Sequence, residues 1–144
     1  MRTLKFSGGV CGITGIAIIL LFAPVAAAGI PEPDLVVYGR VITTENQLVT
    51  SGDLVWTYTP TNGGAPVVVS AELSSIAGDG ETFSYSIRIP CETVMDGFTA
   101  TANTISLSST PITYQRAVTV DGATASMLEG QTTTISTADR GRID

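Results

Sequence analysis

The segment TFSYSIRI, residues 82–89, alternates polar and apolar side chains at every position. Its apolar members are Phe83, Tyr85, Ile87 and Ile89, and the polar residues between them are Ser84, Ser86 and Arg88. Successive side chains of an extended strand point to opposite faces, whereas an α-helix repeats every 3.6 residues. The segment is therefore predicted to be a strand with one face buried and the other in solvent.

The same period of two recurs on both sides of this segment. Further strands are expected at 35–42, 53–59, 66–73, 98–107, 112–120, 123–128 and 132–136. Turn-forming residues separate them: Asn62-Gly63-Gly64 and Gly78-Asp79-Gly80 supply positive φ, and Asp121-Gly122 is a two-residue hairpin signal. No long segment has an amphipathic helical pattern. Seven or eight short strands at these intervals predict an all-β chain, folded as an antiparallel two-sheet β-sandwich.

The domain boundaries follow from the same pattern. The β-sandwich is expected over residues 35–137, with an extended lead-in at 29–34 whose two prolines disfavour helix. Residues 138–144, ADRGRID, form a charged C-terminal tail. A frayed tail is the simpler interpretation, and the alternative is a segment that docks on a neighbouring molecule as an added strand.

Two parts of the chain carry a resemblance to a known family. VYGRV at 37–41, a polar turn at 45–47 and GDLVW at 52–56 are similar to the opening hairpin of carboxypeptidase-regulatory-like domains. DGETFSYSIRIP at 79–90 resembles the later D-G-x-F-x-x-x-I-P element of these domains, with one extra residue before the phenylalanine. The resemblance implies the transthyretin-like (prealbumin-like) sandwich and an accessory role rather than an activity.

This resemblance covers residues 35–90, about half of the chain that follows the leader. After Pro90 the chain departs from the family. Members usually continue with a tight G-x-Y strand, whereas residues 91–97 here form a longer polar connection. The strand order after Pro90 is therefore left open by the resemblance.

The first 28 residues have the pattern of a secretory signal peptide. Arg2 and Lys5 give a positive start, and residues 12–25 are an almost unbroken apolar run. Ala26-Ala27-Ala28 offers the small residues that a signal peptidase reads, so cleavage is expected before Gly29.

The alternative interpretation of the leader is a transmembrane anchor. The apolar run is too short for this, because spanning a bilayer takes about 20 residues, and Pro24 lies near its end. Cys11 precedes the run and is expected to be removed with the leader. We therefore expect a secreted or extracellular chain with no stable membrane span, the periplasm or cell surface being other exported destinations.

The charge of the processed chain is strongly negative. Cleavage removes Arg2 and Lys5 and leaves five arginines against 13 acidic residues, a formal charge of −8. No lysine and no histidine remain. Nucleic acid is excluded as a partner, because its sequence-independent binding depends mainly on Lys and Arg. Anionic membranes are disfavoured for the same reason, and solubility is the simplest interpretation of the acidity.

The composition also excludes most catalytic chemistries. Without histidine the chain lacks the usual general base, the serine-triad partner and the commonest zinc ligand. Without lysine it cannot form a Schiff base or a Lys–Asn isopeptide bond. Cys91 is the single cysteine after the leader, so it has no intramolecular disulfide partner. A buried thiol is expected, and an intermolecular disulfide is the alternative.

Acidic residues in predicted turns leave two possibilities open. Asp79, Glu81, Glu92 and Asp96 are the candidates for a calcium site, since calcium takes oxygen ligands. Paired carboxylates also suffice for glycoside hydrolysis. No spacing matches a calcium-loop motif and no context favours a raised pKa, so solvated turn acids are the preferred interpretation, with no cofactor expected.

The aromatic residues have a core interpretation and a ligand-binding one. Trp56, Tyr58, Phe83 and Tyr85 lie on alternating strands beside aliphatic residues, where rings usually form core. A carbohydrate-binding face is the alternative for these four. The two rings expected to be more exposed, and so candidates for a ligand face, are Tyr38 and Tyr114.

Three functions follow from these observations. The first is a secreted, non-catalytic binding or structural module that contacts another extracellular protein or a glycan. The second is a subunit of a surface assembly or filament that self-assembles through edge strands. The third and least supported is a carboxylate-only glycoside hydrolase; the chain is not expected to be an enzyme.

Overall fold

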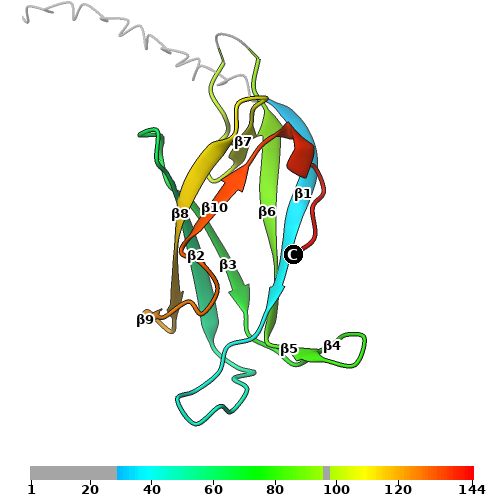
Figure 1. The fold of residues 1–144 in the computed structure, drawn as a ribbon, viewed down its shortest axis with the longest axis vertical. Coiled ribbons are helices and arrows are strands. Elements are labelled where there is room, and N and C mark those ends of the chain that lie inside the picture. The colour runs from blue at the N-terminus through cyan, green and yellow to red at the C-terminus, as the bar shows by residue number, and fades with distance from the viewer. Residues whose placement is uncertain (1–28, 96–97) are drawn as a thin grey trace, which may run out of the picture.

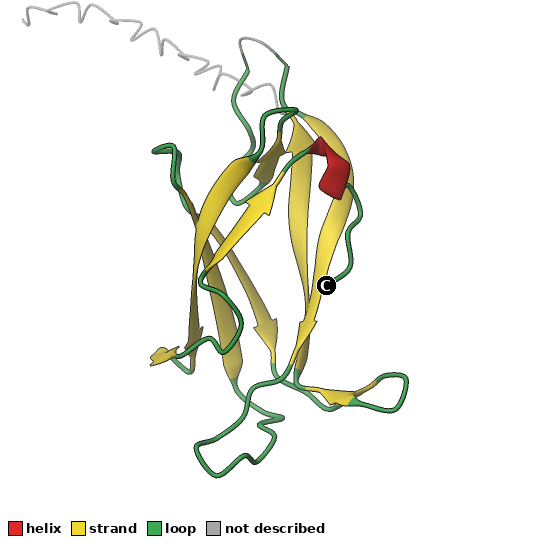
Figure 2. Cartoon of the chain, viewed as in Figure 1, coloured by secondary structure: helices red, strands yellow, loops and turns green. Residues whose placement is uncertain are grey.

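The computed structural model describes residues 29–95 and 98–144, and the chain there is almost entirely strands (Figures 1 and 2). The strands are β1 (Ile30–Gly39), β2 (Asp53–Pro60), β3 (Val67–Glu72), β4 (Ile76–Ala77), β5 (Thr82–Phe83), β6 (Tyr85–Thr93), β7 (Ile105–Leu107), β8 (Ile112–Val120), β9 (Ala123–Ala125) and β10 (Thr132–Ile135). One 3₁₀ turn, Thr137–Asp139, is the sole helical element of this described part. The all-β prediction is confirmed.

The leader predicted over residues 1–28 lies outside the described residues. Across the part of the chain that is described, no helix has both the length and the apolar character needed to cross a bilayer.

Two larger sheets and one small hairpin make up the architecture. The first sheet has the order β1-β6-β7, and the second has the order β10-β8-β2-β3, with β9 also paired to β8. β4 and β5 form a separate hairpin that projects from one end of the molecule (Figure 1). Among the named strands, every pairing is antiparallel except that of β6 with β7, which is parallel. The prediction of purely antiparallel pairing is therefore wrong at this position.

A single core lies between the two larger sheets, because alternate residues of each strand point toward the other sheet. On β2 the inward residues Leu54, Trp56 and Tyr58 are all buried, as the alternation predicts. Residues of β6 and β7 join the same cluster from the opposite sheet, among them Ile87 and Ile105. Each large apolar side chain buried this way contributes roughly 1.5–3 kcal/mol of transfer free energy.

Two predicted turns join strands as expected. Asp121 and Gly122 have φ of 49° and 79°, and they connect β8 to β9 in the left-handed conformation that a type I′ hairpin needs. Gly80 has φ of 82° in the turn between β4 and β5. The positive φ at these positions explains why the chain has glycine and aspartate there.

The predicted lead-in is part of the fold. β1 starts at Ile30, which lies opposite Thr93 at the end of β6, and the antiparallel pairing continues to Gly39. The register is irregular between Glu32 and Leu35. Proline lacks an N–H, so strands that contain it are confined to sheet edges and bulges. β1 meets this condition, since it ends the order of its sheet.

The C-terminal tail does not fray, and it pairs with its own chain. Val36 N donates to Arg142 O at 3.0 Å, Asp144 N donates to Val36 O at 2.9 Å, and Tyr38 N donates to Asp144 O at 2.8 Å. This added segment runs parallel to β1 and covers its outer edge. The interpretation of a frayed tail is wrong, because the segment finds a partner far away in the sequence.

The predicted strand at 98–107 is shorter than expected. Only Ile105–Leu107 is a strand, and Phe98 is 43 % exposed. Residues 98–104 lead into β7 beside the end of β6, in the direction needed for the parallel pairing.

Candidate functional site

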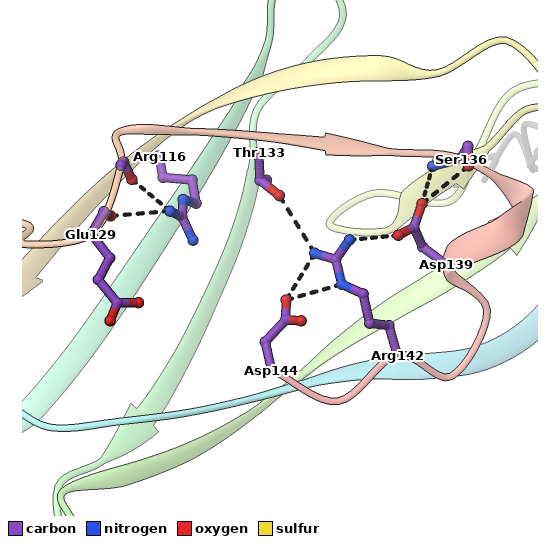
Figure 3. A network of polar contacts seen from close by, with 8 residues as sticks. Arg116, Glu129, Thr133, Ser136, Asp139, Arg142 and Asp144 are labelled. Atoms are coloured by element: carbon purple, nitrogen blue, oxygen red, sulfur yellow. Dashed lines mark hydrogen bonds and ion pairs between the residues drawn. The ribbon is translucent and has the colours of Figure 1, made fainter.

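The tail is fastened by one arginine. Arg142 Nη2 lies 2.8 Å from Asp144 Oδ2 and donates to Thr133 Oγ1 of β10 at 3.4 Å, and Nη1 pairs with Asp139 (Figure 3). Asp139 in turn accepts a hydrogen bond from Ser136 N at 2.7 Å. The network links β10 to the added segment on β1, and so ties the two larger sheets together along this side.

The electrostatics of the network favour the charged form of Asp139. Burial alone would raise the pKa of this carboxyl, but hydrogen bonds from Ser136 and Arg142 outweigh it and hold the pKa below its ordinary value. A second ion pair joins Arg140 to Glu32 of β1 at 3.1 Å. The tail is therefore held by charges at both of its ends.

The tail forms one wall of an apolar hollow of about 380 Å³, which we call the hairpin recess. Its lining comes from β1, the β4–β5 hairpin and the tail: Tyr38, Ile76, Ala77, Gly78, Asp79, Phe83, Ile143 and Asp144. Tyr38 and Phe83 lie 5.8 Å apart between ring centroids, at 54°. Tyr38 is 39 % exposed and Ile143 is 69 % exposed, so apolar surface faces solvent here.

The shape of the recess depends on close packing within the hairpin. A Cβ added to Gly78 would lie 2.6 Å from Phe83 Cε2, so only glycine lets the hairpin backbone approach this ring. The charged residues of the lining are Asp79 and Asp144, and the lining contains no basic residue. The hollow thus offers an exposed ring, aliphatic carbons and hydrogen-bond acceptors.

A second hollow, of about 340 Å³, lies between the β2–β3 turn and the start of β8. It is lined by Thr61, Asn62, Ser108, Thr110, Pro111, Ile112 and Thr113. It contains neither an aromatic ring nor a charged side chain, so its lining is less specific than that of the hairpin recess.

The four candidate calcium ligands do not form one cluster. Asp79 and Glu81 lie in the β4–β5 turn, next to the start of β6, and Glu92 lies near the far end of β6. A strand advances about 3.3 Å per residue, so the two groups lie at opposite ends of the domain. Asp96 lies outside the described residues, and among the described residues no three acidic or cysteine side chains come together as metal ligands.

Glu92 has a structural environment instead. Its side chain is 7 % exposed, and Oε2 accepts hydrogen bonds from Thr101 N at 2.9 Å and Gly29 N at 3.3 Å. Hydrogen bonding from Thr101, opposed by partial desolvation, lowers the pKa of this carboxyl below its ordinary value. The charge thus joins the start of β1 to the connection that precedes β7.

Of the two tyrosines expected to be exposed, only Tyr38 is. Tyr114 is 3 % exposed, and burial raises the pKa of its hydroxyl. It lies on the inward face of β8, so the prediction that Tyr114 belongs to a ligand face is wrong. Trp56, Tyr58 and Tyr85 are buried as predicted.

Cys91 is 2 % exposed on the inward face of β6. Burial raises the pKa of its thiol, which keeps the sulfur in its less reactive neutral form. An intermolecular disulfide would need this side chain to leave the core. The geometry agrees with the buried-thiol interpretation.

Arg116 is a core-facing residue that the sequence reasoning missed. Its guanidinium carbon lies 5.7 Å from the Trp56 ring centroid, and Nη2 donates to the carbonyl oxygens of Glu129 and Gly130 (Figure 3). Its position in the strand could have revealed this orientation. Arg116 lies two residues from both Tyr114 and Val118, which point inward, so its side chain is on the same face. This arginine holds the connection between β9 and β10 against the core.

Comparison of the chain with protein-family models, with curated proteins and with solved structures gave no match. The resemblance to carboxypeptidase-regulatory-like domains therefore stays a prediction from residues 35–90.

Proposed function

We propose that this protein is an exported, non-catalytic β-sandwich module that binds an oligosaccharide in the hairpin recess. The observation that carries the proposal is the exposed Tyr38 ring beside Phe83, in a hollow whose charged residues are both acidic. Export rests on the leader pattern of residues 1–28.

The chemistry of the recess suits a sugar. A pyranose has an apolar face of C–H groups, which packs on an exposed aromatic ring, and a rim of hydroxyl donors. Tyr38 supplies the ring, Ile76 and Ile143 extend the apolar floor, and Asp79 supplies acceptor oxygens at the edge. Small-ligand sites commonly combine an apolar lining with few polar groups in this way.

The recess lacks the arrangement that hydrolysis requires. A glycoside hydrolase needs two carboxyl groups facing each other across the bond that is cleaved. Asp144 Oδ2 is engaged by Arg142 at 2.8 Å, which leaves Asp79 as the carboxylate without an ion pair among the described residues that line the recess. The geometry therefore favours binding over catalysis.

A glycan array probed with the labelled chain from Gly29 tests the proposal, because that chain contains the whole described core. Binding should then weaken about tenfold in Tyr38→Ala, the loss expected for an aromatic contact of roughly 1.5 kcal/mol. Phe98→Ala is the matched control, since Phe98 is a similarly exposed ring in the connection at the other end of β6. Absence of any glycan binding, or equal loss in both variants, contradicts the proposal.

A further inference from the structure

The turn that joins β2 to β3 projects from the domain (Figure 1). Its base is fixed on the start of β8, because Thr61 N and Thr61 Oγ1 donate to Thr113 O at 2.9 and 3.0 Å. Beyond Thr61 come Asn62, Gly63 and Gly64, all of them exposed. A Cβ added to Gly63 would meet nothing within 4 Å, so this part of the turn lies in open space.

An asparagine followed by glycine can react with its own backbone. The nitrogen of the following residue loses its proton to water and attacks the side-chain carbonyl carbon, and the amide group takes up a proton and leaves as ammonia. The product is a cyclic imide, which water then opens to aspartate or to isoaspartate. The reacting groups are held close together within the chain, which favours ring closure. Glycine favours it further, because it has no side chain to obstruct the ring and its backbone rotates freely.

The structure leaves Asn62 open to this reaction. Among the described residues no hydrogen bond engages its side-chain amide. The attacking nitrogen, Gly63 N, donates to Pro60 O at 3.4 Å, the longest backbone hydrogen bond in the turns and loops that are described. A hydrogen bond of this length is weak, so little has to be broken before the nitrogen can attack.

The other two asparagines of the chain are held more firmly. Gln47, which follows Asn46, is fixed on both sides: its N donates to Thr43 Oγ1 at 3.2 Å, and its O accepts from Thr43 N at 2.9 Å. Asn103 Oδ1 accepts a hydrogen bond from Val68 N at 3.3 Å. Each of these asparagines is followed by a residue with a side chain, which obstructs ring closure. The β2–β3 turn therefore contains the asparagine best placed to react.

We propose that Asn62 is a site of spontaneous deamidation, and that this modification gives the second hollow a negative charge. The lining of that hollow includes Asn62 and contains no charged side chain. Conversion of the amide to a carboxylate takes the formal charge of the chain from Gly29 from −8 to −9. The hollow then repels acidic ligands and attracts cationic ones, so its charge changes with the age of the protein.

The modified residue lies outside the strand pairings, so the sandwich should stay folded. The pairing of β2 with β3 reaches Tyr58 and Val67, and the pairing of β2 with β8 ends at Pro60. An isoaspartate at position 62 lengthens the main chain only within the turn over residues 61–66. The thermal midpoint should therefore stay within about 3 °C, as for an ordinary surface substitution. Glycan binding in the hairpin recess should not change, because the two hollows share no lining residue.

Incubation of the chain from Gly29 at mildly alkaline pH, followed by isoelectric focusing, tests the inference. A band with one additional negative charge should appear, and it should form more slowly at acidic pH because the attacking nitrogen must lose its proton. Peptide mapping should place the new aspartate and isoaspartate at residue 62. Conversion of Asp79 or Asp121 to isoaspartate leaves the charge unchanged, so the new band reports asparagines alone.

Asn62→Gln should abolish the acidic band, since the longer side chain closes a ring far more slowly. Asn46→Gln and Asn103→Gln are the matched controls and should keep the band. Persistence of the band in Asn62→Gln would overturn the inference. So would a native chain that stays unaltered under conditions that convert the free peptide of residues 58–67, because the fold would then protect Asn62.

Discussion

Replacing Glu92 with glutamine should destabilise the domain by about 2 kcal/mol, because hydrogen bonds to a charged group contribute roughly 1.5–3 kcal/mol. The side chain keeps its size, so packing changes little. What is lost is the charge that accepts hydrogen bonds from Thr101 N at 2.9 Å and Gly29 N at 3.3 Å. The midpoint of thermal unfolding should fall by about 8 °C for a domain of this length.

The hydrogen bond from Gly29 N to Glu92 leads to a second prediction, on the effect of the amino-terminal charge. If the chain begins at Gly29, its N–H group is part of an α-ammonium, and the hydrogen bond to Glu92 becomes an ion pair. At 3.3 Å and an effective dielectric constant of about 20, the Coulomb attraction is roughly 5 kcal/mol before desolvation. Desolvation of the two buried groups offsets most of this, so the free-amine chain should be about 1 kcal/mol more stable than its acetylated form.

Urea unfolding followed by the fluorescence of Trp56, the single tryptophan, measures both effects. Four samples form a cycle: the unaltered chain and the Glu92→Gln variant, each with a free or an acetylated amino group at Gly29. Acetylation should destabilise only the chains that keep Glu92, and above about pH 9 the difference should vanish because an α-amino group is then neutral. Equal effects of acetylation in both backgrounds would refute the pairing.

The dependence of the free energy of unfolding on pH, at acidic pH, gives an independent check on the Glu92 carboxyl. The folded state lowers the pKa of Glu92, so its contribution is fully present above the ordinary pKa of a glutamate, about 4.3. That contribution is lost as the pH falls through the lowered value in the folded state. Glu92→Gln should therefore unfold with a weaker dependence on pH in this acidic range than the unaltered chain.

Three further predictions concern the stability of the domain and the burial of Cys91. Arg142→Ala should lower the free energy of unfolding by about 2 kcal/mol, because it leaves the partly buried carboxylate of Asp139 without its cation. The more exposed Arg140→Ala should cost about 0.5 kcal/mol, and equal losses in urea unfolding would contradict the network. Cys91 should react with a thiol reagent only in denaturant, and fast labelling of the native chain would show that it is not buried. Gly39→Ala should destabilise by about 3 kcal/mol through collision with the Tyr85 ring, so a thermal midpoint within about 2 °C of the unaltered chain, well below the shift that such a loss implies, would refute this packing.

Local pattern is sufficient to predict where several strands lie, although not the bounds of β1, β6 and β7. The alternation over β2 and β6 identifies both the strand and its buried side, and the Asp121-Gly122 dipeptide identifies the hairpin of β8 with β9. These features depend on residues that are close together in the sequence. The alternation of apolar residues, the turn-forming residues and the strand propensity all depend on the same short stretches of sequence. These strands and turns can therefore be inferred from the sequence alone.

Tyr114 shows why the orientation of a strand is harder to predict. It is in phase with Arg116, and a charged residue on one side of a strand normally indicates the solvent side. Here the guanidinium lies inside because carbonyl groups of Glu129 and Gly130 accept its hydrogen bonds, 13 and 14 residues further along the chain. Partners at that distance are fixed by the tertiary fold and leave no local pattern.

The hairpin recess is unpredictable for the same reason. The sequence marks Tyr38 as an exposed ring, but its neighbours Phe83 and Ile143 come from segments far away in the sequence. The sequence shows that the tail is charged, but it does not show which residue pairs with each charge. The pairing of Arg142 with Thr133 and of Arg140 with Glu32 requires that the two sheets are already assembled.

The pairing of the tail with β1 has a consequence for the order of folding. Val36 bonds to Arg142, roughly a hundred positions later in the chain, and β1 pairs on its other side with β6. Folds dominated by such non-local contacts form on the order of milliseconds to seconds, because long loops close before their contacts stabilise anything. β1 therefore gains its second neighbour only after residues 142–144 have been synthesised. A nascent chain that still lacks residues 142–144 has β1 as an open edge of its sheet.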